Sequence, residues 1–190
     1  MCGVCGIFDP SQKTKLNSQL DSMVNTLRHR GPDDCGIWFS LDGRVALGHR
    51  RLSVIDCSAA GKQPMESKCG RYTIVYNGEI YNYQTIRKEL EQDHSIRWDG
   101  HSDTEVLLEA ISTWGFEEAI KSTNGMFALA VWDKKHKQLL LARDRLGEKP
   151  LYYGWFGNQF VFASELKAIY EACNRNLQLD DEALTLFFKI

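Results

Sequence analysis

The sequence has no apolar run that approaches the roughly 18–20 residues a membrane-spanning helix needs. It also has no apolar segment flanked by Lys or Arg near its start, so a secretory signal is not expected. The 23 Lys and Arg residues nearly balance the 25 Asp and Glu residues, and neither sign gathers into a stripe or a tail. We therefore expect no membrane and no nucleic acid as partners, and a cytoplasmic protein.

Familiar catalytic and nucleotide-binding signatures are also missing. The sequence contains no Gly-x-Gly-x-x-Gly, Walker loop, Gly-x-Ser-x-Gly or His-Glu-x-x-His segment. The chain is therefore not expected to be a typical dinucleotide-binding protein, a P-loop nucleotide-binding protein, a serine hydrolase of the α/β-hydrolase type or a zinc protease. Any chemistry therefore has to come from a less common arrangement of residues.

The six cysteines are scattered, and the chain is long enough to bury a core without disulfides. Reduced thiols in a cytosolic protein are the better interpretation. Cys2 and Cys5 have the Cys-x-x-Cys spacing of redox and zinc sites, but zinc needs a second such pair, so no metal is expected. Residues three apart on a strand face opposite sides, which places Cys5 in the core and Cys2 elsewhere. A dithiol redox protein is kept as an alternative.

Cys2 follows the initiator methionine and becomes the first residue once Met1 is removed. It then carries both a thiol and a free α-amine. An ordinary thiol, with a pKa of about 8.5, is mostly protonated at neutral pH, whereas an α-amine titrates at roughly 7.7–8.0. The amine can therefore act as the base that activates the thiol, as in threonine nucleophiles that use their own amine. The plain alternative is that Cys2 only begins an ordinary first strand.

Strand-like segments come mostly in pairs, with helical segments between them. Three hairpins are expected, pairing residues 37–39 with 45–49, 126–132 with 139–142, and 151–153 with 160–163. Helices are expected over 16–27, after a capping Ser102, after a capping Ser164 and over 177–190. This pattern favours an α+β fold with antiparallel sheets over a doubly wound parallel sheet. We expect one domain over residues 1–190, cut from a longer chain, because the final helix ends without a cap.

Several polar segments, taken together with Cys2, form the most specific signal. They are Arg30–Asp33, Gly48–Ser53, Tyr76–Asn82, Ser102–Glu105, Arg143–Tyr153 and Phe162–Lys167. In this order and approximate spacing they resemble the glutaminase domain of glutamine-dependent asparagine synthetases, which are class II amidotransferases of the N-terminal-nucleophile (Ntn) hydrolase superfamily. Each segment alone is weak, whereas the ordered set covers nearly the whole chain.

The resemblance implies a nucleophile and an oxyanion hole. Cys2 matches the family's nucleophile and supplies both thiol and α-amine. Asn77 matches the oxyanion donor that acts through its side-chain amide, and Gly78 matches the donor that acts through its backbone N–H. Asn-Gly is by itself more often a tight-turn dipeptide, and a turn could also aim such an N–H outward. We therefore keep both interpretations of this pair.

The resemblance also implies a clamp for the amino-acid end of glutamine. Arg51 matches the arginine that holds the α-carboxylate, a task that suits a planar bidentate donor. Glu79 and Asp103 match the residues that bind the α-ammonium. Asp103 has an alternative role, since a carboxylate in the first turn of a helix complements the helix dipole. The histidines at positions 29, 49 and 101 invite a Cys–His pair, but with an amine base they are interpreted as structural or loop residues.

Taken together, the resemblance implies a four-layer α/β/β/α Ntn-hydrolase sandwich with two antiparallel sheets. It implies hydrolysis of L-glutamine to L-glutamate and ammonia through a thioester on Cys2. In the family this ammonia goes to a C-terminal synthetase domain, and ATP and Mg²⁺ are expected only there, with no cofactor in the present domain.

Three questions remain open at the level of sequence. Relatives of the asparagine synthetases also amidate other carboxylates, so the acceptor is undetermined. A domain that retains Met1 could instead be a non-catalytic glutamine-sensing or interface domain. A homodimer is also left open.

Overall fold

The computed structural model of the chain describes residues 1–12, 16–53, 61–93, 96–173 and 180–189. Two antiparallel sheets form its centre, of five strands in the order β2-β3-β1-β9-β8 and of four in the order β4-β5-β6-β7. The first contains β1 (Gly3–Phe8), β2 (Asp34–Phe39), β3 (Val45–Arg51), β8 (Tyr152–Phe156) and β9 (Gln159–Ala163). The second contains β4 (Met65–Glu66), β5 (Tyr72–Ile80), β6 (Gly125–Asp133) and β7 (Gln138–Arg143).

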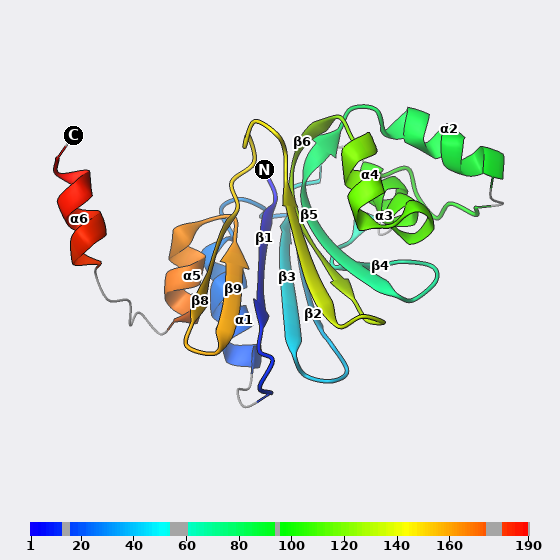
Figure 1. Cartoon of the computed structure of the whole chain (residues 1–190). Coiled ribbons are helices and arrows are strands. Elements are labelled where there is room, and N and C mark those ends of the chain that lie inside the picture. Colours follow the sequence, from blue (N-terminus) through cyan, green and yellow to red (C-terminus); the bar gives the residue numbers. More distant parts are fainter. Residues whose placement is uncertain (13–15, 54–60, 94–95, 174–179, 190) are drawn as a thin grey trace.

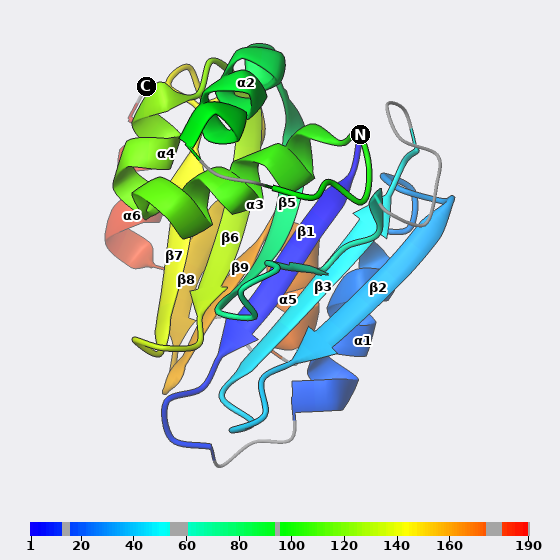
Figure 2. The same cartoon turned by 90° about the vertical axis from the view of Figure 1, so that its right-hand side faces the viewer.

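Helices cover the outer face of each sheet (Figure 1). The five-stranded sheet is covered by α1 (Leu16–Thr26) and α5 (Leu166–Ala172). The four-stranded sheet is covered by α3 (Asp103–Trp114), against which α2 (Tyr83–Asp93) and α4 (Phe116–Ser122) pack. In Figure 2 the helices α3 and α4 cross in front of β5 and β6. The last helix, α6 (Asp181–Phe187), stands apart from these layers, and all its residues are exposed. Within the described ranges, no helix has the length and apolarity needed to cross a membrane.

Three separate apolar clusters hold the layers together. One joins α1 and α5 to the five-stranded sheet, through residues such as Leu20 and Ile169. Another joins α2, α3 and α4 to the four-stranded sheet, through residues such as Leu107. The third lies between the two sheets and includes Leu47 and Trp132. The result is the α/β/β/α sandwich that the resemblance predicted.

Strand β5 shows why the strands of the two middle layers have apolar residues at consecutive positions in the sequence. Because a sheet inside the sandwich is covered on both faces, alternate residues of its strands are buried on opposite sides. Ile74 belongs to the cluster beneath the helices, whereas its neighbour Val75 belongs to the cluster between the sheets. Both side chains are fully buried.

The three predicted hairpins are confirmed as β2–β3, β6–β7 and β8–β9. Gly43 in the first turn has a φ of 68°, a conformation in which glycine avoids steric cost. Ser102 is confirmed as the N-cap of α3, and its hydroxyl accepts a hydrogen bond from the Glu105 N–H at 3.2 Å.

Other parts of the prediction were wrong or incomplete. Ser164 does not cap α5, which begins after Glu165; its hydroxyl instead accepts the Val4 N–H at 3.0 Å. The seven-residue helix α4 was not predicted, because it is too short to show a clear apolar period. Of the helix expected over 177–190, residues 181–187 are helical as α6, whereas residues 177–179 and 190 lie outside the described ranges.

The packing beneath α1 generates a stability prediction. Leu20 is fully buried in the cluster that joins α1 to the five-stranded sheet, so Leu20→Ala should lower the free energy of unfolding by roughly 2–5 kcal/mol. Leu41 is fully exposed, and Leu41→Ala is the matched control, with an expected change within about 0.5 kcal/mol. Urea unfolding of the three proteins measures both values. Equal decreases in the free energy of unfolding of the two variants would contradict the conclusion that Leu20 helps to hold α1 on the sheet.

Candidate active site

A cavity of about 310 Å³ opens beside the first residues of β1. It is lined from both sheets, by Arg51 at the end of β3 and by the last residues of β5, and also by the start of α3. All the site residues expected from the sequence line it: Cys2, Arg51, Asn77, Gly78, Glu79 and Asp103. The fold thus gathers into one place residues that are up to 101 positions apart in the chain.

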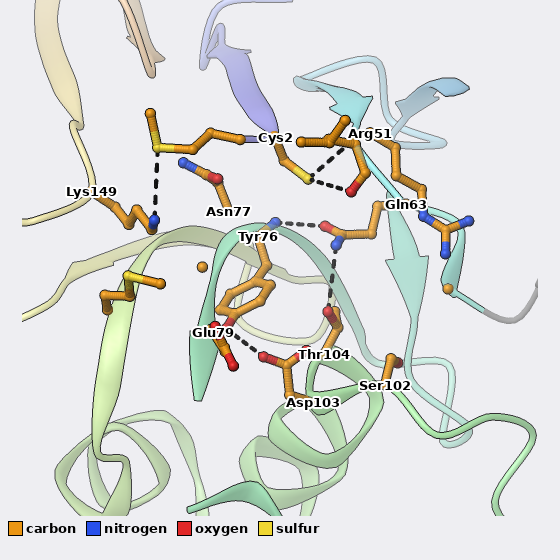
Figure 3. A pocket seen from close by; sticks show the side chains of 15 residues that line it. Cys2, Arg51, Gln63, Tyr76, Asn77, Glu79, Ser102, Asp103, Thr104 and Lys149 are labelled. Atoms are coloured by element: carbon orange, nitrogen blue, oxygen red, sulfur yellow. Dashed lines mark hydrogen bonds between the residues drawn. The ribbon is translucent and has the colours of Figure 1, made fainter. Parts of the chain in front are cut away.

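Cys2 lies just before β1 and points its sulfur towards the end of β3 (Figure 3). The pairing of Gly3 with Arg50 brings the two chain segments together. The Leu52 N–H donates to the Cys2 sulfur at 3.4 Å, and the thiol donates to the Leu52 carbonyl oxygen at 3.7 Å. The Arg30 guanidinium holds the other side of the residue, because its Nε donates to the Cys2 carbonyl oxygen at 2.9 Å.

Cys5 belongs to the core, as predicted from its spacing. It is fully buried in the cluster beneath α1, and its thiol donates to the Gly48 carbonyl oxygen at 3.8 Å. Burial raises the pKa of the Cys5 thiol well above its ordinary value. Cys2 and Cys5 are both free thiols, and only Cys2 lines the cavity. Their positions give no support to the dithiol alternative.

Asn77 and Gly78 lie inside strand β5, so the interpretation of this pair as a tight turn was wrong. They pair with Ala128 and Phe127 of β6. A Cβ at position 78 would lie 2.7 Å from the Phe127 Cα and would also collide with the carbonyl oxygen of Met126. Glycine is therefore required here by the close approach of β6.

The Asn77 side chain is almost completely buried, and its amide nitrogen has no hydrogen-bond partner among the described residues. A buried donor without a partner costs roughly 1–3 kcal/mol, and such groups are rare in folded proteins. Because Asn77 lines the cavity, a ligand there can accept this hydrogen bond.

Charged side chains surround the cavity on other sides (Figure 3). Arg51 comes from the end of β3 and is only 8% exposed. Glu79 comes from β5 and is exposed, whereas Asp103 is the first residue of α3 and is buried. In Figure 3 the two carboxylates lie on the side of Tyr76 away from Cys2 and Asn77. Among the residues predicted from the sequence, one cationic and two anionic groups thus border a space that Cys2 also borders.

Asp103 is held by β5. Its Oδ2 accepts the Tyr76 hydroxyl at 2.7 Å and the Ile80 N–H at 2.9 Å. Burial raises the pKa of the Asp103 carboxyl, the charge of Glu79 raises it further, and these hydrogen bonds act in the opposite direction. Its place in the first turn of α3 also fits the helix-dipole interpretation, so both roles are compatible with its position.

Several cavity residues were not singled out from the sequence. Gln63 accepts the Tyr76 N–H at 2.6 Å with its side-chain oxygen, and its Nε2 lies 3.5 Å from the Thr104 hydroxyl. Lys149 is buried, and its ammonium lies 3.7 Å from the Met1 sulfur. Lys149 belongs to one of the segments that carried the resemblance. Nothing in the neighbouring sequence, however, indicates that its side chain lies close to the N-terminus.

The contacts of His49 and His29 agree with their interpretation as structural or loop residues. His49 is buried, its Nε2 lies 3.1 Å from the Tyr76 carbonyl oxygen, and burial lowers its pKa to about 4. His29 is at the surface, 2.8 Å from a Glu165 carboxylate oxygen. His29, His49 and His101 are all absent from the cavity lining. Among the described residues, no three His, Cys, Asp or Glu side chains come together in a way that could hold a metal ion.

The glutamine amidotransferase domain model matches residues 1–190. The chain belongs to this family. It is 42% identical over 99% of its length to asparagine synthetase [glutamine-hydrolyzing] 3 of Bacillus subtilis, and 36% identical over its whole length to a putative asparagine synthetase of Methanocaldococcus jannaschii. It spans only 30% and 39% of those two proteins.

A solved structure shares the fold of this amidotransferase chain. It is the glutamine phosphoribosylpyrophosphate amidotransferase of B. subtilis in complex with ADP and GMP. The TM-score is 0.73 with 23% identity, over 90% of this chain and 43% of that one. The predicted four-layer sandwich with two antiparallel sheets is therefore confirmed, and this solved amidotransferase shares it at the level of fold.

The different surroundings of the cysteines predict their reactivity. Iodoacetamide at neutral pH should modify Cys2, which is partly exposed in the cavity, and the exposed Cys35 and Cys69, but not Cys5. Burial and its raised pKa together keep Cys5 unreactive until the protein unfolds. Peptide mapping by mass spectrometry, before and after denaturation, shows which cysteines have been modified. Modification of Cys5 in the folded protein as fast as of Cys2 would contradict the assignment.

Proposed function

We propose that this domain hydrolyses L-glutamine to L-glutamate and ammonia, with Cys2 as the nucleophile. The observation that carries the proposal is the arrangement of the cavity. A partly exposed cysteine, a buried amide donor without a partner, and separate cationic and anionic groups border the same space. L-glutamine has complementary groups, namely a side-chain amide, an α-carboxylate and an α-ammonium.

In the proposed reaction, removal of Met1 leaves Cys2 with a free α-amine that accepts the thiol proton. The sulfur then attacks the amide carbon of glutamine and forms a C–S bond. Negative charge develops on the former carbonyl oxygen, where the Asn77 amide and the Gly78 N–H are the proposed donors. Collapse of this intermediate breaks the C–N bond and releases ammonia, which takes its proton from the α-ammonium. Water then cleaves the thioester and yields glutamate.

The charged residues are proposed to hold the amino-acid end of the substrate. The Arg51 guanidinium suits the α-carboxylate, because its planar donors match a carboxylate in two hydrogen bonds. Glu79 and Asp103 suit the α-ammonium. Such a clamp fixes the distance between the substrate backbone and the nucleophile, which lowers the entropic cost of reaching the transition state.

Met1 has a specific place in this proposal. Its side chain borders the cavity, with the sulfur close to Lys149. Removing Met1 would therefore free the amine and also vacate part of the space. A protein that keeps Met1 would instead support the non-catalytic, glutamine-sensing alternative. Sequencing of the N-terminus of the purified protein distinguishes the two.

The destination of the ammonia is also a proposal, supported by the names of the relatives and by the short part of them that this chain spans. We propose that a synthetase domain of a longer protein uses the ammonia, and that ATP and Mg²⁺ act there rather than in this domain. Aspartate is the proposed acceptor, with another carboxylate as the alternative. A cytoplasmic location fits the free thiols of the described cysteines.

The oxyanion role of Asn77 can be tested by kinetics. Asn77→Ala should lower kcat for glutamine hydrolysis by about 10²–10³ with little change in KM, because the donor acts mainly in the transition state. Asn77→Asp is a control for packing, since it keeps the shape of the side chain but replaces the donor by an acceptor. It should be impaired at least as severely. An Asn77→Asp enzyme with nearly full activity would contradict the role.

The clamp role of Arg51 has a matched control next to it in the chain. Arg51→Ala should raise KM by about tenfold to a hundredfold, because it removes charge-assisted hydrogen bonds to the substrate. Arg50 donates to Val24 and Asn25 and does not border the cavity, so Arg50→Ala should leave KM nearly unchanged. Steady-state assays of released ammonia measure both variants. Equal effects at the two positions would argue against the clamp.

A further inference from the structure

Tyr76 borders the cavity but has no part in the reaction proposed above. It precedes Asn77 on β5, and its side chain packs in the cluster on the α3 side of the sheet. Its hydroxyl donates to the Oδ2 of Asp103 at 2.7 Å (Figure 3). Its backbone N–H is held by the Gln63 side-chain oxygen at 2.6 Å. Tyr76 is therefore held both at its backbone and at its hydroxyl, and only 3% of the residue is exposed.

The hydroxyl of Tyr76 acts on Asp103 in a defined direction. Burial raises the pKa of Tyr76 well above its ordinary value, so the hydroxyl stays protonated and can only be a donor to the carboxylate. A donor favours the ionised carboxylate, whereas burial and the nearby charge of Glu79 favour the neutral acid. Together with the Ile80 N–H on the same oxygen, the hydroxyl also fixes the orientation of the carboxylate.

An ionised and correctly oriented Asp103 is what an ammonium ligand requires. We propose that Tyr76 is a positioning residue that makes the site selective for ligands with an α-ammonium group, by holding Asp103 as their anionic partner. This inference rests on the proposed function and names the substrate class more narrowly, as γ-amides and acids that carry a free α-ammonium. Ligands that lack this group gain nothing from Tyr76.

Two ligands distinguish selectivity for the α-ammonium from a general structural role of Tyr76 in shaping the cavity. L-glutamate, the proposed product, carries the α-ammonium, and glutarate is the same diacid without it. Calorimetric titration should show that Tyr76→Phe weakens L-glutamate binding by about tenfold, because a hydrogen bond to a charged group is lost. Glutarate binding should change by less than about twofold, because the Arg51 side of the cavity is untouched.

Tyr72→Phe is the matched control. Tyr72 lies on the same face of β5 in the same apolar cluster, is also buried and does not border the cavity. It should keep the wild-type ratio of L-glutamate to glutarate affinity. In glutaminase assays, Tyr76→Phe should raise KM for L-glutamine with kcat within about twofold, whereas a distorted nucleophile would lower kcat.

The pH dependence of binding, compared between the wild-type protein and Tyr76→Phe, gives a second readout. Protonation of Asp103 removes the anion, so the part of L-glutamate binding that depends on this anion should be lost as the pH is lowered. In Tyr76→Phe the carboxyl pKa is higher, and the same loss should begin at a higher pH. The other titratable or charged groups that border the cavity are Glu79 on β5, Arg51 on β3, Lys149, the Cys2 thiol and the N-terminal α-amine. They are unchanged in both proteins, so the difference between the two profiles reports on Tyr76.

The outcomes are distinct. Equal weakening of both ligands in Tyr76→Phe, or an unchanged ratio and pH profile, overturns the inference. Absence of glutaminase activity in the wild-type protein with its N-terminal Cys2 free overturns the proposed function, while the titrations still decide whether Tyr76 controls selectivity for the α-ammonium.

Discussion

The position of β1 at the centre of the five-stranded sheet is the constraint on which the candidate site depends. The strand pairs with β3 along one edge and β9 along the other, and Val4 exchanges two further hydrogen bonds with Ser164. A chain terminus normally frays because its backbone groups find partners in water. Here the ladder with β3 continues up to Gly3, and the Arg30 side chain then holds the carbonyl of Cys2. The backbone groups of the first residues thereby have partners within the protein, which helps to hold Cys2 in place for its proposed role as the nucleophile.

The two sheets contribute different parts of the site, so the layer between them sets its geometry. Cys2 directly precedes β1 and Arg51 ends β3 of the five-stranded sheet, whereas Asn77 and Glu79 come from β5 of the other sheet. The apolar cluster between the sheets, around Trp132, fixes their separation. Close-packed interiors transmit small volume changes, so substitutions in this layer can misplace the proposed nucleophile relative to the proposed oxyanion donors without touching either.

The hairpins, the α3 cap and six of the residues that line the cavity could be predicted from the sequence. The strand conformation of Asn77-Gly78 and the hydrogen bonds around it could not. Asn and Gly are depleted in strands, so local preference indicated a turn. All nine residues of β5 nevertheless pair with β6, and that long-range pairing outweighs the preference. Tyr76 and Gln63 were missed for a related reason. Their partners lie 13 to 41 residues away, and contacts at such distances leave no periodic trace in the sequence.

The cavity keeps polar groups in positions that are unfavourable without a ligand. The Asn77 amide nitrogen is buried without a partner among the described residues, and the Asp103 carboxylate is buried beside a second carboxylate at Glu79. Each arrangement costs free energy that apolar residues would avoid. A ligand that accepts from Asn77 and brings a positive charge to Asp103 removes both costs when it binds. The instability of the empty site therefore favours ligands that satisfy both groups at once, and a water molecule or an inorganic cation can satisfy only one of them.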